Sequence, residues 1–439
     1  MLVNASSLVG TTAITSVLGF VYWWLAARQF SLEDVGFASA TISAMSLLGT
    51  LGMLGMGTLL IGELPRHPGK EGPLISAALI LVGAAGGGLG ILFAVVAPFA
   101  STDFQALGAN LQNILLFAIG VSLTAIALVL DQALIGLLRS GQRLWRNALF
   151  SVAKLAALFA TGLWLSHATG LTIYATWAAG NALSLVALAG IVVAKGGVST
   201  RNYLPRWRLL GKLKLSAFQH HILNLILQVP GLILPVVVTI VLSARVNAWF
   251  YVSFMFANFV SVIPVSLATV LYAMSSAQPS VLARKIWLTL SLALATCTLA
   301  DCLLLFGARQ VLGLFGHTYA EEASWCLRIL CLGAFPLIIK NHYVAICRVN
   351  GRLARAMLPI AIGTLLEVTI PVLGARLGGL SGLSLGLLAA LCIEALFMSH
   401  TVYRAVRPID VPTTQKQPEP YRDDMSPAET HSRKPSFGP

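Results

Sequence analysis

Charged side chains are scarce in this sequence. Only 10% of its 439 residues are charged, and Asp and Glu together number 16. Soluble globular domains carry about 25% charged residues, so an ordinary soluble domain is excluded. Hydrophobic residues make up 57% of the chain, and the mean hydropathy is +0.83. This composition predicts an all-α integral membrane protein.

Signatures of catalysis and of metal binding are also missing. The sequence contains no P-loop, GxSxG, zinc motif or dinucleotide fingerprint in a suitable context. Its six cysteines lie within or beside apolar segments, without metal-ligand spacing or a disulfide framework. We therefore expect a protein that is not an enzyme and that uses no cofactor and no metal.

Long apolar runs dominate the chain. A helix needs roughly 20 apolar residues to cross the hydrocarbon core, and charge, glycine and proline divide the sequence into twelve such runs. The predicted helices span residues 5–27, 36–62, 74–100, 113–138, 148–166, 172–194, 217–242, 246–273, 286–307, 326–346, 357–376 and 380–403. The predicted fold is therefore about 12 transmembrane helices in two six-helix lobes.

A basic stretch, KGGVSTRNYLPRWRLLGKLK, lies between the two sets of six helices at Lys195–Lys214. It predicts an N-terminal lobe at 1–194, a cytoplasmic inter-lobe linker at 195–216 and a C-terminal lobe at 217–407. An ordinary cytoplasmic loop is the alternative interpretation of this stretch. After the last helix the composition becomes rich in Pro, Asp, Glu and Ser, which predicts a disordered cytoplasmic tail at 408–439.

Basic residues are distributed unevenly between alternate loops. If the N-terminus is cytoplasmic, the loops on that side hold sixteen basic residues and the opposite loops hold five. Cytoplasmic loops of membrane proteins carry an excess of Lys and Arg. The formal charge of +13 thus indicates membrane topology rather than nucleic-acid binding, and both termini are predicted to be cytoplasmic.

Two short patterns recur in the same order in both halves. RSGQRLWR at Arg139–Arg146 and RVNGRLAR at Arg348–Arg355 share R-x-x-x-R-L-x-R, with an offset of 209 residues (348 − 139). LAAR ending at Arg28 matches LSAR ending at Arg245. The recurrence predicts lobes related by an axis along the membrane normal, an arrangement that transporters use for alternating access.

Six ionisable side chains lie within the predicted spans. Such groups are costly in lipid, so they mark substrate or ion pathways unless they form structural pairs. Asp131 and Lys154 lie at equal depth in one hairpin, and Lys340 is within reach of Glu367 in another, so each hairpin is expected to hold an acid and a base. Structural ion pairs and a lining for an anionic substrate or a protonation switch are the alternative interpretations. The six residues are Asp131, Lys154, Asp301, Lys340, Glu367 and Glu394.

A polar stripe follows one face of the seventh predicted helix. His221, Asn224 and Gln228 are spaced at i, i+3 and i+7, and His220 lies beside them. The first predicted helix has the same spacing in a stripe made of Asn4, Ser7, Thr11 and Thr15. Matching stripes on the first helix of each lobe predict a shared wet cavity, with helix–helix hydrogen bonding as the alternative.

Three stretches resemble polysaccharide-export (O-antigen) flippases of the MATE-like MOP superfamily. They are FVYWWLAARQFSLEDVGFASA (Phe20–Ala40), HHILNLILQVPGLILPVVV (His220–Val238) leading into WFYVSFMFANFVSVIP (Trp249–Pro264), and FPLIIKNHYVAICRVNGR (Phe335–Arg352). The resemblance implies a V-shaped pair of lobes that moves a lipid-linked glycan of lipopolysaccharide or other polysaccharide biosynthesis across the bacterial inner membrane. It also implies contact with membrane lipid and with glycosyltransferases or a polymerase of the same pathway.

The same resemblance implies a cationic cavity for the diphosphate of such a substrate. Its candidate lining residues are Lys154, Lys340, His220, His221, Asn224 and Gln228, and the candidates for coupling or ion pairing are Asp131, Asp301, Glu367 and Glu394. A cation-coupled multidrug exporter of the same fold is one alternative, and it favours acids in the cavity without matching lysines. A membrane component or scaffold of envelope polysaccharide synthesis is the alternative from another class.

Overall fold

The computed structural model describes residues 2–67, 69–164, 168–194, 205, 215–277 and 282–406. All regular secondary structure in these residues is helical. Ten helical segments are long and apolar enough to cross a membrane. Helix α1 adds one crossing, and the change of direction within α16 divides that segment into two, so the described residues contain the twelve predicted crossings.

The first lobe contains six crossings. The loop between Gly52 and Met56 divides the second crossing into α2 and α3, because Leu54 and Gly55 adopt positive φ angles of 49° and 78°. Ser31 caps α2 by accepting a hydrogen bond from the Asp34 backbone N–H at 3.1 Å. The helices are α1 (Leu2–Gln29), α2 (Leu32–Gly52), α3 (Met56–Glu63), α4 (Glu71–Ala100), α5 (Gln105–Gly108), α6 (Leu111–Gly136), α7 (Ser140–Trp164) and α8 (Gly170–Ala194).

The second lobe repeats the six crossings. Its fourth crossing is divided at Gly333, and its last two are the arms of α16, which turns at the non-helical residues Gly378 and Gly379. The helices are α10 (Leu215–Val241), α11 (Ala244–Ala277), α12 (Leu282–Gly313), α13 (His317–Glu322), α14 (Ser324–Leu332), α15 (Ala334–Val349) and α16 (Leu353–Val406).

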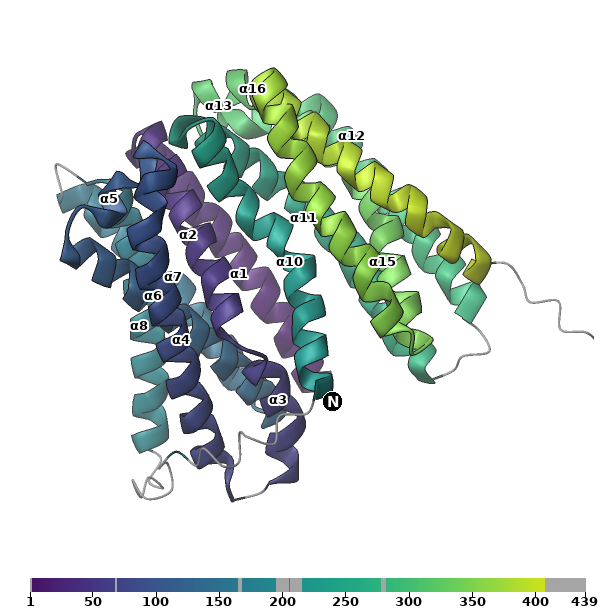
Figure 1. Ribbon diagram of the computed structural model, residues 1–439, viewed down its shortest axis with the longest axis horizontal. Helices are drawn as coiled ribbons and strands as arrows, with labels where there is room; N and C mark the ends of the chain where they lie inside the picture. The colour runs from purple at the N-terminus through teal and green to yellow at the C-terminus, as the bar shows by residue number, and fades with distance from the viewer. Residues whose placement is uncertain are drawn as a thin grey trace, which may run out of the picture.

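The two lobes form a V (Figure 1). They meet at one end, and they diverge at the end where α10 begins and α16 finishes. At the closed end Gly36 abuts the backbone of Ala244, so that a Cβ at position 36 would collide with the Ala244 carbonyl. Nearby, the Asn247 side-chain amide donates to the Gly36 carbonyl at 2.8 Å and to the Ser39 hydroxyl at 3.0 Å. These contacts join α2 to α11 and hold the lobes together at this end.

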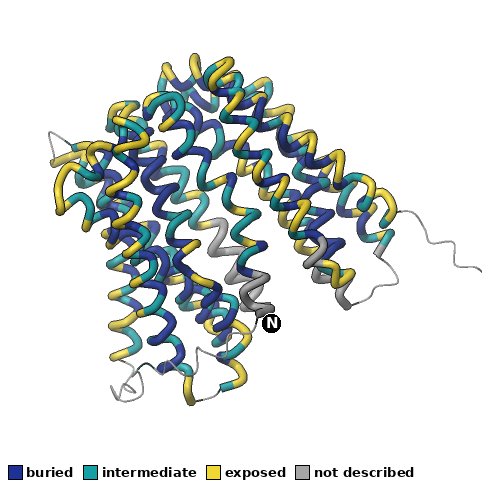
Figure 2. Tube along the Cα trace, viewed as in Figure 1, coloured by how far each residue is buried: buried dark blue, intermediate teal, exposed yellow. Residues whose placement is uncertain are grey.

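Burial follows the pattern of a protein dissolved in lipid. Buried residues line the interior of each lobe, whereas the outer faces of the helices are exposed (Figure 2). Large apolar side chains are exposed along the helices, including Phe397 at 81% exposure in α16 and Phe306 at 84% in α12. Exposed apolar patches of this extent are rare on soluble monomers, so the described structure is a multi-pass membrane protein.

The predicted helix boundaries needed three corrections. The run predicted at 148–166 begins eight residues earlier, at Ser140, which places Arg146 inside α7 rather than in a loop. The runs predicted at 36–62 and 326–346 are each two helices. The predicted basic linker, apart from residues 205, 215 and 216, and the whole predicted tail at 408–439 lie outside the described residues.

Candidate functional site

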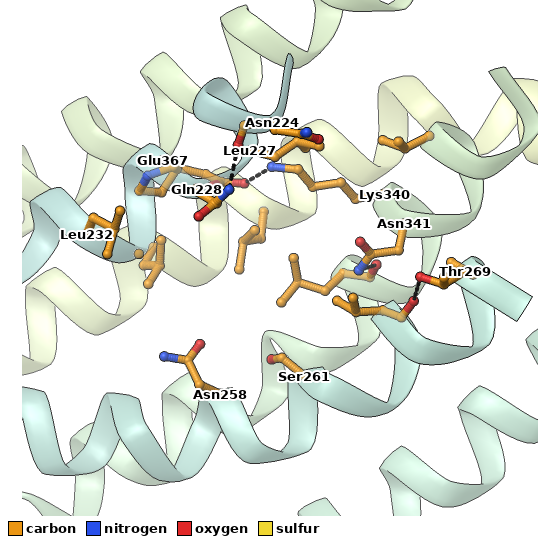
Figure 3. A pocket seen from close by; sticks show the side chains of 18 of the residues that line it. Asn224, Leu227, Gln228, Leu232, Asn258, Ser261, Thr269, Lys340, Asn341 and Glu367 are labelled. Atoms are coloured by element: carbon orange, nitrogen blue, oxygen red, sulfur yellow. Dashed lines mark hydrogen bonds and ion pairs between the residues drawn. The ribbon is translucent and has the colours of Figure 1, made fainter. Parts of the chain in front are cut away.

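A cavity of about 580 Å³ opens inside the second lobe, between α10, α11, α15 and α16 (Figure 3). Its wall combines apolar side chains with amides and hydroxyls, and Arg348 supplies a cation. The polar and charged lining residues are Asn224, Gln228, Asn258, Ser261, Thr269, Lys340, Asn341, Arg348 and Glu367. This mixture can hydrogen-bond a ligand that carries many hydroxyl groups.

A second cavity, of about 380 Å³, lies between the lobes and has an aromatic wall. It adjoins the first cavity, because both are lined by Gly231, Leu232, Phe254 and Asn258. Its aromatic residues come from α1, α8 and α11, and they are Phe20, Trp23, Trp177, Tyr251, Phe254 and Phe259. The two cavities together present a polar surface in one lobe and an aromatic surface at the seam between the lobes.

Lys340 lies between two carboxylates at the wall of the first cavity. Its Nζ lies 2.6 Å from Oε1 of Glu367 and 3.0 Å from Oε2 of Glu394. All three side chains are at most 6% exposed, and the two acids come from the two arms of α16. The predicted approach of Lys340 to Glu367 is present, and Glu394 joins it. Two ionised acids and one ammonium give a net charge of −1, which one added proton would neutralise.

Lys154 does not form the predicted pair with Asp131. Its ammonium instead lies among three aromatic rings, 3.3 Å from the centroid of Trp177, 4.7 Å from that of Phe150 and 5.0 Å from that of Tyr22. Cation–π attraction is strongest over tryptophan and increases when the pair is desolvated. Trp177 also lines the second cavity, so Lys154 lies one aromatic layer behind the cavity wall.

Asp131 pairs with Arg146. The guanidinium donates from Nε at 2.9 Å and from Nη2 at 2.8 Å to the two carboxylate oxygens, and Asn147 adds a hydrogen bond at 3.0 Å. The equal membrane depth of Asp131 and Lys154 did not identify the partner of Asp131. Helix α7 begins earlier than predicted, and this places Arg146 inside the lobe, where its side chain is 3% exposed. A planar guanidinium matches a carboxylate in two places, whereas a lysine ammonium does not.

The two lobes match in a register four residues from the predicted one. The Arg139 backbone N–H bonds to the Leu134 carbonyl at 2.8 Å, and the Arg352 N–H bonds to the Cys347 carbonyl at 2.9 Å. Each bond ends a helix in the same way, and α7 and α16 each begin at the next residue. Arg139 therefore corresponds to Arg352 rather than to Arg348. In this register, with an offset of 213 residues (352 − 139), Lys154 corresponds to Glu367.

The other predicted site residues are divided between the cavity and the lobe interiors. Asn224 and Gln228 line the first cavity, and Thr15 lines the second. His221 is buried and lines neither of these two cavities. The side chains of His220, Asn4, Ser7 and Thr11 lie outside the described part of the chain. Asp301 is buried in α12, and neither of its carboxylate oxygens has a hydrogen-bond partner among the described residues.

Sequence reasoning did not identify Arg348, Asn258 and Asn341 as cavity residues. Arg348 was assigned to a cytoplasmic loop, but its Nη2 lies 3.4 Å from the Asn224 Oδ1 at the cavity wall. Asn258 is an amide within the predicted span 246–273, and Asn341 lies next to Lys340 in the span 326–346. A polar side chain within a membrane span was the available signal for both.

Solved structures of membrane transporters have the same fold. An inward-facing multidrug resistance MATE family transporter of the MOP superfamily matches with a TM-score of 0.66 at 14% identity, over 90% of this chain and 98% of that chain. The lipid II flippase MurJ in an inward closed conformation matches with a TM-score of 0.69 at 15% identity, over 92% and 88%. An outward-facing MATE family transporter gives 0.58 at 11% identity, over 91% and 94%.

No protein-family model and no curated protein sequence matches the chain. The structural likeness spans nearly the full length of both partners, so the fold is that of MOP superfamily transporters. The sequence resemblance implied this fold.

Proposed function

We propose that this protein is a flippase that moves a polyprenyl-diphosphate-linked oligosaccharide across the bacterial inner membrane by alternating access. The fold supports a transporter, because MATE transporters and the flippase MurJ share it. In the proposed topology the open end of the V faces the cytoplasm, since the loops rich in Lys and Arg connect the helices there.

The observation that carries the proposal is the chemistry of the two adjoining cavities. Amides and hydroxyls in the second lobe hydrogen-bond sugar hydroxyls, and the neighbouring aromatic wall packs against the apolar faces of sugar rings. Arg348 lines the first cavity, and its planar guanidinium can donate two hydrogen bonds to a phosphate group. A lipid-linked glycan presents all three of these chemical features.

The two buried lysines have different roles in this proposal. Lys340 is already neutralised by Glu367 and Glu394, so Arg348 makes the first contact with the diphosphate. Lys154 is the second cation, and it becomes available to the anion only if the Trp177 ring moves aside. In the inward-open state the cation that contacts the substrate is thus Arg348. Lys154 contacts the substrate only in a later state of the transport cycle.

A cation-coupled multidrug exporter is the second candidate. It is favoured by the excess of one carboxylate in the group formed by Lys340, Glu367 and Glu394. A cationic drug needs an acid that is free to face it, and Glu367, the acid that lines the cavity, bonds to Lys340 at 2.6 Å. For this reason the geometry favours the glycan over the drug.

The proposal is tested in cells that lack the gene and carry it on a plasmid. The complete deletion should cause a lipid-linked glycan to accumulate on the cytoplasmic face, and Arg348→Gln should reproduce much of that accumulation at a normal protein level. Arg352→Gln is the matched control, because Arg352 is exposed at the same turn and does not line the cavity. Unchanged lipid-linked glycan together with increased sensitivity to cationic drugs would support the exporter instead.

A further inference from the structure

A groove of about 720 Å³ runs along the first lobe between α4, α6 and α8. None of its lining residues lines either of the two adjoining cavities. It begins at the open end of the V, where the α3–α4 turn, the α6–α7 turn and the end of α8 come together. The transport path does not account for this groove.

The groove has a polar mouth and an apolar interior. Glu71, Arg139 and Gln142 lie at the mouth, and the interior is lined by Ile75, Leu79, Ile126, Leu130, Leu134, Leu137, Leu185, Leu188, Ala189, Val192 and Val193. From Leu137 to Ile126 the interior follows α6 for eleven residues, or roughly 16 Å at 1.5 Å per residue. That length matches one leaflet, because the whole hydrocarbon core is about 30 Å thick.

The mouth carries one positive and one negative side chain that form no ion pair with the part of the chain that the structure describes. Neither Arg139 nor Glu71 has a side-chain hydrogen bond or an ion pair with the described residues, and the two do not pair with each other. Nearby Arg143 is engaged differently, since its Nε lies 3.8 Å from Asp131 Oδ2. Lys70 precedes Glu71 but does not line the groove. The mouth is therefore complementary to a headgroup with both an anionic and a cationic end.

We propose that the groove binds a phosphatidylethanolamine molecule from the cytoplasmic leaflet. The phosphate contacts Arg139 and Gln142, the ammonium donates hydrogen bonds to Glu71, and one acyl chain lies along α4, α6 and α8. A primary ammonium can donate to a carboxylate, whereas the quaternary group of phosphatidylcholine cannot. An anionic headgroup such as that of phosphatidylglycerol satisfies Arg139 but is repelled by Glu71.

Local roles for the two charged residues give a different expectation. Glu71 lies in the first turn of α4, where an acid interacts favourably with the helix dipole, and Arg139 fits the general excess of basic residues on the cytoplasmic side. Those roles alone predict no preference among phospholipids. A measurement of lipid selectivity therefore distinguishes these local roles from a phosphatidylethanolamine-binding site.

The test uses the full-length protein in vesicles of equal parts phosphatidylethanolamine, phosphatidylglycerol and phosphatidylcholine, followed by native mass spectrometry of the lipids retained. We expect severalfold enrichment of phosphatidylethanolamine on the unaltered protein. Glu71→Gln should abolish the preference of the protein for phosphatidylethanolamine over phosphatidylglycerol. Arg139→Gln should reduce the retention of all three lipids. Arg66→Gln is the matched control, because Arg66 is an exposed arginine of the same region that does not line the groove.

A third variant tests the interior of the groove. Ala189 is exposed on the groove wall, so Ala189→Trp should fill the space and reduce retention while leaving the lobe packing intact. Equal retention of the three lipids by the unaltered protein, or enrichment of phosphatidylglycerol, would overturn the proposal. If Ala189→Trp fails to fold, the two charge variants, at half-buried Glu71 and exposed Arg139, still decide the outcome. The proposal is independent of the transported substrate.

Discussion

The ammonium of Lys154 lies 3.3 Å from the centroid of the Trp177 ring, and it forms no ion pair with the described residues. Lys340, in contrast, lies between two carboxylates. The same residue type is thus held in the two lobes by different forces, cation–π attraction in one and ion pairing in the other. The two lysines should respond differently to the same substitution.

Lys154→Met should leave the protein folded with a thermal unfolding temperature close to that of the unaltered protein. Methionine fills a similar volume among Tyr22, Phe150 and Trp177, and sulfur–aromatic contacts compensate for part of the lost attraction. Thermal unfolding in detergent measures the effect, with Lys340→Met as the comparison that should unfold at a clearly lower temperature. Equal losses in the two variants would show that Lys154 has a carboxylate partner.

Asp131→Ala should destabilise the first lobe by about 3 kcal/mol, because it leaves the Arg146 guanidinium buried without its partner. The double variant Asp131→Ala with Arg146→Met should recover much of that loss. Arg143→Gln is the control, since the Arg143 side chain is 23% exposed and lies 3.8 Å from the carboxylate. Chemical unfolding measures all four proteins, and a tolerated Asp131→Ala would contradict the pairing.

Lys340→Gln should lower both the expression level and the unfolding temperature, because it leaves the Glu367 and Glu394 carboxylates buried without a cation. Adding Glu394→Gln to this variant should restore part of the stability by removing one negative charge. Glu394→Gln alone should be well tolerated, since Lys340 and Glu367 then form a neutral pair. Greater instability of the double variant than of Lys340→Gln would refute this arrangement.

The sequence was sufficient to predict the membrane class, the twelve crossings and the two lobes. Hydropathy and charge asymmetry are properties of whole segments, so errors of a few residues at helix ends do not alter them. The partners of individual charges depend on helix register instead. Asp131 was matched with Lys154 by depth, but an earlier start of α7 brings Arg146 to the carboxylate.

Two features of the site depend on tertiary structure alone. Glu394 reaches Lys340 only because α16 turns back at Gly378 and Gly379. The aromatic rings around Lys154 come from three helices, α1, α7 and α8. Residue spacing along the chain does not predict that these rings lie next to one another.

Gly36→Val should prevent the closed end of the V from forming, because the added side chain would collide with the Ala244 backbone. The reporter is Ser39→Cys in a background without native cysteines, labelled in intact cells by an impermeant thiol reagent. Labelling should be low in the reporter alone and high with Gly36→Val. Gly88→Val is the control, because a Cβ at Gly88 meets no atom within 4 Å. Low labelling with Gly36→Val would mean that this contact does not control closure.

The most direct measurement of the proposed function is transbilayer movement in proteoliposomes of a fluorescent polyprenyl-diphosphate oligosaccharide. The unaltered protein should move this lipid between leaflets, Arg348→Gln should slow the movement severalfold, and Arg352→Gln should match the unaltered protein. Absence of movement by a folded, reconstituted protein that instead drives a cationic drug across the same membrane would contradict the account.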